Sequence, residues 1–349
     1  MIYFCLLIVI IAIIFGGLSI KLKSNSILFV IFVLLSLFCG LRYNVGVDYD
    51  AYLLIFDDIK SGNDISVQEP GYRLLVEAII AIGGNQQLVF LLFAFATNLL
   101  IYKYIKYNSP NSPFLSLFTY LCVGAFFLSS LNLVRQYLAI AIFAYSLKYV
   151  MNKKFYKYLI IILLGAFFAH TTLLLLLPVY LLNNKISNKS KLVIILSLFL
   201  LSRFVAVIIQ ASSYSVYLLA SDVDNSMELI YLFFIITFLL LLVDCFDKCN
   251  CKHLFFNLNF MSFLFLMTMI LNPNITTDIF MRMNNYFFIG AIVLIPSVLS
   301  LFKQLRARLL LSTFYFLFLF VYYFRNTLLN GFDSKLLPYN INLYLFDIF

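Results

Sequence analysis

Long apolar runs alternate with short polar segments along almost the whole chain. Runs with the character of a membrane span lie at residues 1–20, 27–41, 86–102, 114–131, 135–150, 159–182, 192–210, 229–246, 254–271, 281–302 and 309–324. A bilayer core is about 30 Å thick, so a spanning helix needs roughly 20 mainly apolar residues. The pattern predicts an all-α polytopic membrane protein with about twelve transmembrane helices, in a single domain over residues 1–349.

The polar segments between these runs differ in the sign of their charge. Lys21 and Lys23 follow the first run, whereas residues 42–85 carry more Asp and Glu than Lys and Arg. An excess of Lys and Arg marks the cytoplasmic side of a membrane protein. The N-terminus and the acidic segment are therefore expected on the outer side. Alternation along the chain adds two further outer segments, the loop 211–228 and the tail 325–349.

Residues 71–83 are too short to cross a bilayer comfortably. At their start, Glu69, Arg73 and Glu77 follow one another at intervals of four residues, which places them on one face of a helix. We therefore predict a half-helix that lies at the outer interface and turns at Gly83-Gly84.

Residues 159–182 form an apolar run that conflicts with the charge rule if it is a single span. One crossing would place three lysines of the next polar segment outside: Lys185, Lys189 and Lys191. Two shorter tilted helices, broken at Ala169-His170, remove the conflict. The sequence thus predicts a hairpin that carries His170 to the outer side.

Composition excludes several classes of protein. With 64% hydrophobic and 11% charged residues, the chain is too apolar for a soluble protein, and its net charge of +9 is scattered, which argues against nucleic-acid binding. The first run has no basic segment before it and no cleavage site, so it is expected to be a span. There is no phosphate-binding Gly-rich loop, which argues against direct ATP hydrolysis.

The six cysteines fit neither a disulfide framework nor a zinc site. Three of them gather at 245–251, in a predicted cytoplasmic loop, and a metal site could be drawn there together with His253. Their spacing matches no common zinc pattern, so we predict a reduced, solvated loop. No metal and no other cofactor is expected.

Arg135 is the only charged residue between Pro113 and Lys148. An arginine near hydrocarbon costs several kcal/mol unless its head reaches water or a partner. Arg135 lies in the sequence NLVRQYLA, residues 132–139, between two predicted spans. We expect it at an outer turn, where it would help to hold an anionic, lipid-linked substrate.

The two basic residue types separate in this topology. Fourteen of sixteen lysines fall on inner loops, whereas six of eight arginines fall toward the outer side: Arg42, Arg73, Arg135, Arg203, Arg282 and Arg325. Arginine binds phosphate oxygens in a bidentate manner and stays charged when partly desolvated. Arg42, Arg135 and Arg282 are expected at helix ends and are the leading candidates for a diphosphate site.

The other three arginines have simpler explanations. Arg73 can serve only to bridge two acids of its own helix, although it remains a candidate for substrate binding. Arg203 and Arg325 are expected to pair with acids or to reach the membrane interface.

Three outer side chains are candidate bases for an acceptor hydroxyl: Asp48, Glu69 and His170. The alternative is a solvated loop position for the acids and a packed core position for the histidine. Tyr52 and Tyr72 lie next to the candidate acids, and such rings stack on sugar faces. An interfacial aromatic belt accounts for most of the other tyrosines.

Several short motifs occur in a distinctive order along the chain: Arg42…Gly46-Val-Asp48…Tyr52, Glu69-Pro-Gly71-Tyr72, Arg135-Gln136-x-x-Ala139, His170 before a Pro-containing apolar run, and Arg282-x-x-x-Tyr286. This order resembles the EpsG family of Wzy-like polysaccharide polymerases, most clearly over residues 40–180. One departure is Ala169-His170-Thr171-Thr172, where we expect an aromatic residue before the histidine and a serine nearby.

The resemblance implies an integral-membrane glycosyltransferase, similar in fold to GT-C-type polymerases. Such an enzyme joins undecaprenyl-diphosphate-linked repeat units of lipopolysaccharide O-antigen, capsule or exopolysaccharide, without a nucleotide sugar, at the periplasmic face of the bacterial inner membrane. By the same resemblance, Arg42, Arg135 and Arg282 steady the diphosphate, and Gln136 and Tyr286 belong to the substrate site. A chain-length regulator is an expected partner, beside membrane lipids.

Two other functions remain open at this point. A flippase for lipid-linked oligosaccharides also has about twelve spans, but related halves and polar residues through the membrane depth are expected of it. The polar residues here gather on the outer side, and the sequence has no evident repeat. An O-antigen ligase shares the lipid-linked donor but transfers to lipid A core sugar. The order of the motifs favours the polymerase.

Overall fold

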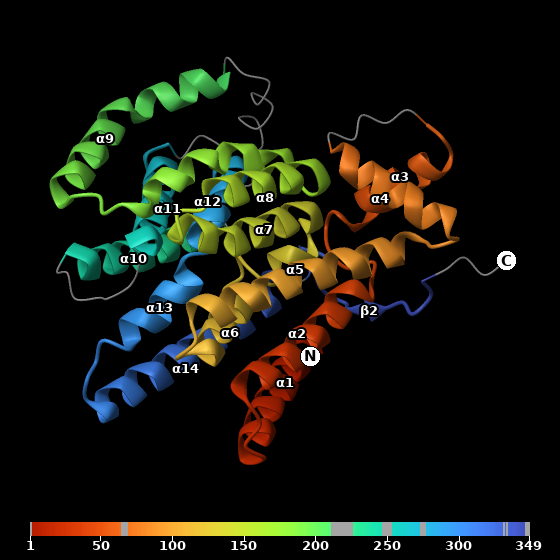
Figure 1. Cartoon of the computed structure of the whole chain (residues 1–349), viewed down its shortest axis with the longest axis horizontal. Helices are drawn as coiled ribbons and strands as arrows, with labels where there is room; N and C mark the ends of the chain where they lie inside the picture. Colours follow the sequence, from red (N-terminus) through yellow and green to blue (C-terminus); the bar gives the residue numbers. More distant parts are fainter. Residues whose placement is uncertain are drawn as a thin grey trace. The chain divides into compact units, whose positions relative to one another are not determined.

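The computed structural model describes residues 2–63, 69–210, 226–245, 253–272, 277–330, 332 and 334–345. Helices make up 79% of the structure, which confirms the predicted all-α class (Figure 1). The chain divides into two compact units: unit 1 comprises Met1–Leu177 and Leu309–Phe349, and unit 2 comprises Pro178–Arg308.

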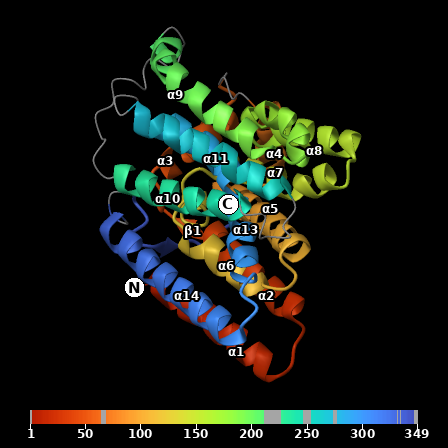
Figure 2. The same cartoon turned by 90° about the vertical axis from the view of Figure 1, so that its left-hand side faces the viewer.

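Unit 1 is organised around α5 (Gln86–Asn108), which packs against α2 (Ser24–Gly40) and α7 (Val134–Met151) (Figure 1). Phe90, Phe93 and Ile101 of α5 are buried in this layer. Two further helices, α1 (Ile2–Ser19) and α14 (Leu305–Asn330), lie side by side in Figure 2. There the hydroxyl of Tyr323 donates a hydrogen bond to the carbonyl of Tyr3 at 3.3 Å.

The acidic segment after α2 contains a helix that the sequence pattern led us to treat as a polar loop. This helix, α3 (Tyr49–Lys60), buries Tyr49, Tyr52, Phe56 and Ile59. The spacing of three or four residues between them is that of one helical face, whereas the acids of α3 lie between them. The high acid content concealed this amphipathic period.

The predicted half-helix is present as α4 (Pro70–Ala81). Pro70 occupies its first turn, where proline is favoured. The helix ends as expected at a glycine, because Gly83 has φ +74°, a left-handed conformation that residues with a side chain rarely adopt.

The segment 114–131, predicted as one span, is not a single helix. Its helix α6 (Pro113–Cys122) stops early, and the chain continues through turns and the short 3₁₀ helix η1 (Ser129–Leu131). Side chains satisfy the carbonyls that leave the helical ladder: Ser129 Oγ donates to Gly124 O at 2.8 Å, and Tyr137 donates to Ala125 O. Polar groups on this segment and on α7 thus replace the missing helical hydrogen bonds.

The predicted break at Ala169-His170 is confirmed. Helix α8 (Phe155–Phe168) ends there, and the 3₁₀ helix η2 (Thr171–Asn183) follows. The two segments fold back on one another, because the hydroxyl of Tyr158 donates to the carbonyl of Leu176 at 2.6 Å. A continuous helix would separate these two residues by about 27 Å.

The C-terminal tail packs on the segment that follows α2. Its strand β2 (Asn340–Ile341) pairs in antiparallel fashion with β1 (Arg42–Tyr43), with Arg42 opposite Ile341. Tyr339 stacks on Phe38 with ring centroids 4.3 Å apart. Two predicted outer segments, residues 42–85 and the tail, therefore lie on the same side of unit 1. The tail starts later than predicted, since α14 extends to Asn330.

Unit 2 contains α9 (Asn188–Gln210), α10 (Ser226–Cys245), α11 (His253–Leu271), α12 (Thr277–Phe288) and α13 (Ala291–Leu299). Lys191 and Asp244 form a buried ion pair between α9 and α10. The predicted span 281–302 is bent by 45° between α12 and α13. At this bend the amide of Gly290 donates a hydrogen bond to the carbonyl of Phe287 at 3.2 Å. The acceptor lies three residues earlier in the chain, whereas an α-helix uses the carbonyl four residues earlier, so the α-helical hydrogen-bond pattern is interrupted here.

Within the described ranges, three helical segments are long and apolar enough to cross a membrane: Gln86–Asn108, His253–Leu271 and Leu305–Arg325. The bent pair formed by α12 and α13 adds a fourth if it counts as one span. Several further helices are apolar but shorter, among them α2, α6 and α8. These helices are those of a membrane protein, and the number of about twelve spans stays a prediction. Most of the predicted outer loop 211–228 and of the cysteine-rich loop 245–251 lies outside the described residues.

Candidate functional site

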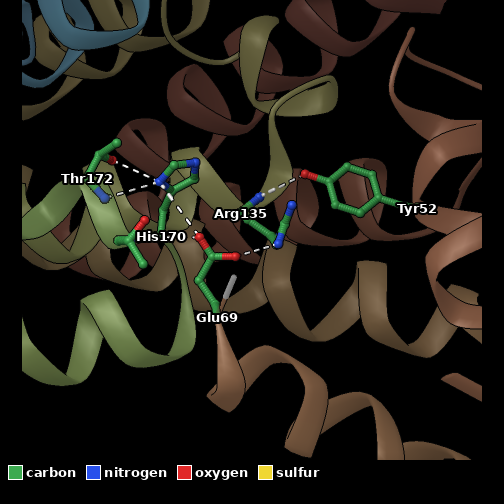
Figure 3. Close-up of polar contacts among 6 residues, drawn as sticks. Tyr52, Glu69, Arg135, His170 and Thr172 are labelled. Atoms are coloured by element: carbon green, nitrogen blue, oxygen red, sulfur yellow. Dashed lines mark hydrogen bonds and ion pairs between the residues drawn. The ribbon is translucent and has the colours of Figure 1, made fainter. Parts of the chain in front are cut away.

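Glu69 and Arg135, separated by 66 residues, form an ion pair in unit 1. Arg135 Nη1 donates to Glu69 Oε2 at 2.6 Å (Figure 3). The Glu69 side chain is only 1% exposed, whereas that of Arg135 is 22% exposed. A carboxylate this deeply buried needs partners for both of its oxygens. The second oxygen, Oε1, accepts from the backbone amide of Thr171 at 3.3 Å.

Two buried tyrosines hold the Arg135 side chain in place. Its guanidinium carbon lies 5.1 Å from the ring centre of Tyr72 and 5.8 Å from that of Tyr52, within the range of cation–π attraction. The Tyr52 hydroxyl also accepts from the backbone amide of Arg135 at 3.3 Å. That amide lies in the first turn of α7, where helical partners are lacking. Burial raises the pKa of both phenols, so they remain neutral donors or acceptors.

His170 stands next to this pair, at the turn between α8 and η2. Its Nδ1 lies 3.9 Å from Glu69 Oε1, too far for a hydrogen bond (Figure 3). Two groups of Thr172 are closer to Nδ1: the hydroxyl at 2.9 Å and the backbone N–H at 3.3 Å. The imidazole is 27% exposed, so it is partly accessible, as the Arg135 side chain is.

Gly71 explains how Glu69 reaches this position. A Cβ at Gly71 would lie 2.6 Å from an atom of Phe167 and 2.7 Å from one of Phe168. The glycine therefore allows the start of α4 to approach the end of α8 closely. This approach brings Glu69, two residues before it, to Thr171 and His170, which follow α8 directly.

The turn that carries Asp48 is joined to the turn before Arg135. Asn132 Oδ1 accepts from the backbone N–H of Val47 at 3.0 Å. Gly46 has φ +100°, and a Cβ there would lie 2.7 Å from Asn132 Oδ1. Asp48 is partly exposed, and its charge contributes to the raised pKa of Tyr52, for which burial is the main cause. The Gly46-Val-Asp48 motif thus lies beside the residues that surround Arg135.

Arg42 is placed differently from the expectation of an open helix end. Its side chain is 1% exposed and donates from Nη1 to Cys39 O at 2.7 Å and from Nε to Val45 O at 3.2 Å. The guanidinium lies 4.3 Å from the ring centre of Phe90. It also lines a narrow pocket together with Thr97, Asn98 and Ser130. In this state of the protein, Arg42 closes the turn that leads to Asp48.

Lys103, Lys106 and Lys148 of unit 1 lie at the C-terminal ends of α5 and α7, away from Arg135. Lys103 and Lys148 lie 5.8 Å and 3.7 Å from the ring centre of Tyr145. Arg135 and Lys148 are thirteen residues apart on α7, which corresponds to about 20 Å along the helix. The predicted separation of arginine and lysine is therefore present in this part of unit 1.

The remaining predicted site residues fall in several places. Gln136 is buried in the first turn of α7, next to Arg135. Arg73 is half-exposed and pairs with Glu77 at 2.9 Å. Arg282, which is exposed, and Tyr286, which is fully buried, belong to α12 of unit 2. Their contribution to the substrate site stays a prediction.

Two contributors to the site were not predicted as such. Asn132 was read only as part of a turn, and Thr172 only as a departure from an expected pattern. Two features of the sequence could have indicated these roles: Asn132 lies two residues before a helix, and Thr172 lies two residues after a histidine. Both act through contacts with backbone or with a neighbouring ring, which no spacing rule covers.

Carboxylates and imidazoles do not gather into a metal site in the part of the chain that the structure describes, since no three of the His, Cys, Asp and Glu side chains there converge. The charged side chain of the site that can bind a substrate group is the guanidinium of Arg135, and it suits an anion. Arg135 retains a buried Nε without a hydrogen-bond partner among the described residues.

Comparison of the sequence with protein families gives one match. The model of the EpsG family matches residues 25–341, which include every residue of the site described above. No curated protein and no solved structure matches the chain.

Proposed function

The chain belongs to the EpsG family, whose members are Wzy-like polymerases, and on that premise we propose that it is a polysaccharide polymerase. It joins lipid-diphosphate-linked oligosaccharide units by glycosyl transfer within the membrane. The donor is a growing chain on a polyprenyl diphosphate, such as undecaprenyl diphosphate, and the acceptor is a hydroxyl of the next lipid-linked unit.

The observation that carries this proposal is the Arg135–Glu69 pair. The buried carboxylate fixes one edge of the guanidinium, at 2.6 Å, and two tyrosine rings fix its plane. The partly exposed remainder of the fork is then oriented in advance for phosphate oxygens. Such preorganised donors stabilise charge that develops on a leaving group without any rearrangement during the reaction.

The proposed reaction exchanges one bond to the anomeric carbon for another. The bond from this carbon to the diphosphate oxygen breaks, and the electron pair leaves with the diphosphate, next to Arg135. The acceptor oxygen forms the new glycosidic bond and loses its proton to a base. Two of the three predicted bases are weakened in that role by their contacts, because Glu69 binds Arg135 and Thr171, and His170 Nδ1 faces Thr172.

Among the three candidates we propose Asp48 as the base, on account of its position. It is partly exposed and sits at the start of α3, in the turn that Asn132 and Arg42 stabilise. This turn places it near Tyr52, which contacts Arg135. A base near the phosphate-binding arginine can act on the acceptor hydroxyl while the arginine holds the diphosphate of the donor.

The charge distribution supports an active site on the periplasmic face of the inner membrane. Lys103, Lys106 and Lys148 mark one end of α5 and α7, and the Arg135 site lies toward the other end of α7. Lysine-rich ends face the cytoplasm. The lipid-linked units would thus reach the site after their transfer across the membrane.

The proposal is tested by gel banding of lipopolysaccharide or capsule in a strain that lacks this gene. The strain is complemented with the wild type, with Arg135→Ala, or with Arg306→Ala at matched membrane levels. Arg306 is an exposed arginine at the start of α14 and serves as the matched control. We expect the wild type and the control to restore the ladder of chain lengths, and Arg135→Ala to leave a single repeat unit.

Other outcomes point to other functions. If the deletion removes even the single-unit band while lipid-linked units accumulate, the protein acts in translocation or ligation. A full ladder with Arg135→Ala would remove the arginine from the reaction.

A further inference from the structure

The contacts of His170 determine which of its ring nitrogens carries the proton. The backbone N–H of Thr172 points to Nδ1 at 3.3 Å, and an amide nitrogen can only donate. Nδ1 therefore accepts, and the Thr172 hydroxyl at 2.9 Å acts as a second donor to the same lone pair. In the neutral imidazole, the proton must then lie on Nε2.

This arrangement differs from a carboxylate–histidine dyad. In a dyad the carboxylate accepts a hydrogen bond from one ring N–H, and the other ring nitrogen is left as a base. Here Glu69 Oε1 lies 3.9 Å from Nδ1, and both of its oxygens already accept from Arg135 and Thr171. Glu69 thus does not turn His170 into a base, although the two residues are neighbours.

We propose, on the basis of the function proposed above, that His170 acts on the substrate as a hydrogen-bond donor through Nε2–H and that Thr172 fixes this tautomer. The acceptor of the bond is an oxygen of the diphosphate held by Arg135. His170 transfers no proton. The hydrogen bond from Nε2–H to the diphosphate oxygen shortens as negative charge grows on the leaving diphosphate. The proton of the attacking sugar hydroxyl goes to Asp48. Thr172 is a positioning residue, because it acts through His170.

The tautomer can be read directly, because the chain holds only two histidines, His170 and His253. The full-length protein with His253→Gln, labelled with ring-¹⁵N histidine, is placed in vesicles of phosphatidylethanolamine and phosphatidylglycerol. Nitrogen NMR at about pH 8, where a histidine is ordinarily neutral, distinguishes the protonated from the unprotonated ring nitrogen. We expect the proton on Nε2. A proton on Nδ1 overturns the proposal, whatever the activity of the protein.

Thr172 is tested in the same sample. With Thr172→Val the hydroxyl is lost while the backbone N–H stays, so we expect Nδ1 to become less shielded by hydrogen bonding and its signal to shift. Thr172→Ser should restore the wild-type signal. An unchanged signal in Thr172→Val would exclude the hydroxyl from this role.

Activity provides the second arm, measured as polymer per unit of membrane-bound protein. The amide N–H of glutamine can replace Nε2–H but cannot act as a base, whereas glutamate offers a base without that donor. We expect His170→Ala and His170→Glu to lower the polymer about 10- to 100-fold, as for a lost hydrogen bond to a charged group, and His170→Gln to retain most of it. Activity with glutamate but not glutamine contradicts the donor role. If the wild-type protein itself produces no polymer, the proposed function is contradicted, whereas the NMR result on the tautomer still stands.

Discussion

Asn132 Oδ1 accepts a hydrogen bond from the backbone N–H of Val47 at 3.0 Å, which joins two turns that lie 85 residues apart in the chain. One turn carries Asp48, and the other leads into the helix of Arg135. Together with the bond from the Arg135 amide to Tyr52, this side chain sets the relative position of the proposed base and the proposed phosphate ligand.

Replacement of Asn132 should separate these two turns. We expect Asn132→Leu to lower stability by about 1 kcal/mol, because the lost hydrogen bond is near the surface, and to reduce polymer length more strongly. Asn132→Asp keeps the accepting oxygen and should behave closer to the wild type. Thermal unfolding in detergent and gel banding measure the two effects. Equal polymer from Asn132→Leu and the wild type would show that the link is unimportant.

Glu69 and Arg135 should act as one unit. Glu69→Gln removes the charge that orients Arg135, and Arg135→Ala leaves a buried carboxylate without its partner, so each should cost about 1–3 kcal/mol in stability and most of the polymer. The double variant should be no worse than the more damaged single variant, as measured by unfolding and by the amount of polymer. Additive losses would mean that the two residues act independently.

Gly71 should tolerate no side chain. We expect Gly71→Ala to push α4 away from Phe167 and Phe168 and so to draw Glu69 out of reach of Thr171. Polymer should fall sharply, with a smaller loss of stability. Gly62→Ala is a suitable comparison for stability, since a Cβ there meets nothing within 4 Å although its φ of +74° adds strain. If Gly71→Ala keeps full activity, close packing at this point is not required.

The tail should be needed for a stable unit 1. A chain that ends at Asn330 loses the β1–β2 pair, the stacking of Tyr339 on Phe38 and the bond from Gly46 N to Lys335 O. We expect a loss of about 3 kcal/mol or more and no polymer. A chain that ends at Leu345 keeps these contacts and should match the wild type. Normal unfolding of the shorter chain would refute the expectation.

The side of the membrane can be measured with single cysteines in a cysteine-free background. Tyr43→Cys lies in the segment after α2, and Tyr156→Cys lies near the lysine-rich end; both positions are exposed. An impermeant maleimide applied to intact spheroplasts should label the first position only. Labelling of the second position alone would reverse the predicted orientation.

Much of this arrangement could be predicted from the sequence, and the reason is physical. The apolar runs give the helices, the isolated Arg135 marks the site, and the excess of lysine beyond residue 182 requires the break at His170. Each of these features reflects the cost of placing a polar or charged group in a membrane, so each can be recognised from residue types alone.

Other features leave no such trace. The early end of α6 depends on Tyr137 and Ser129, whose hydroxyls reach carbonyls that only the folded chain brings near. The burial of Arg42 likewise depends on Phe90 and on carbonyls of its own turn. In both cases tertiary contacts supply the partners of polar groups that helical hydrogen bonds or water would otherwise supply. The spacing of residues along the sequence does not reveal such contacts.

The pairing of β2 with β1 has a consequence for biogenesis. Ile341 is made 299 residues after Arg42, yet the two are neighbours in one ladder. The ribosome must therefore synthesise this long stretch of chain before the turn around Gly46 receives its partner Lys335. A nascent chain without the tail thus lacks part of the support of the candidate site, and a bulky group attached next to Ile341 should interfere with maturation.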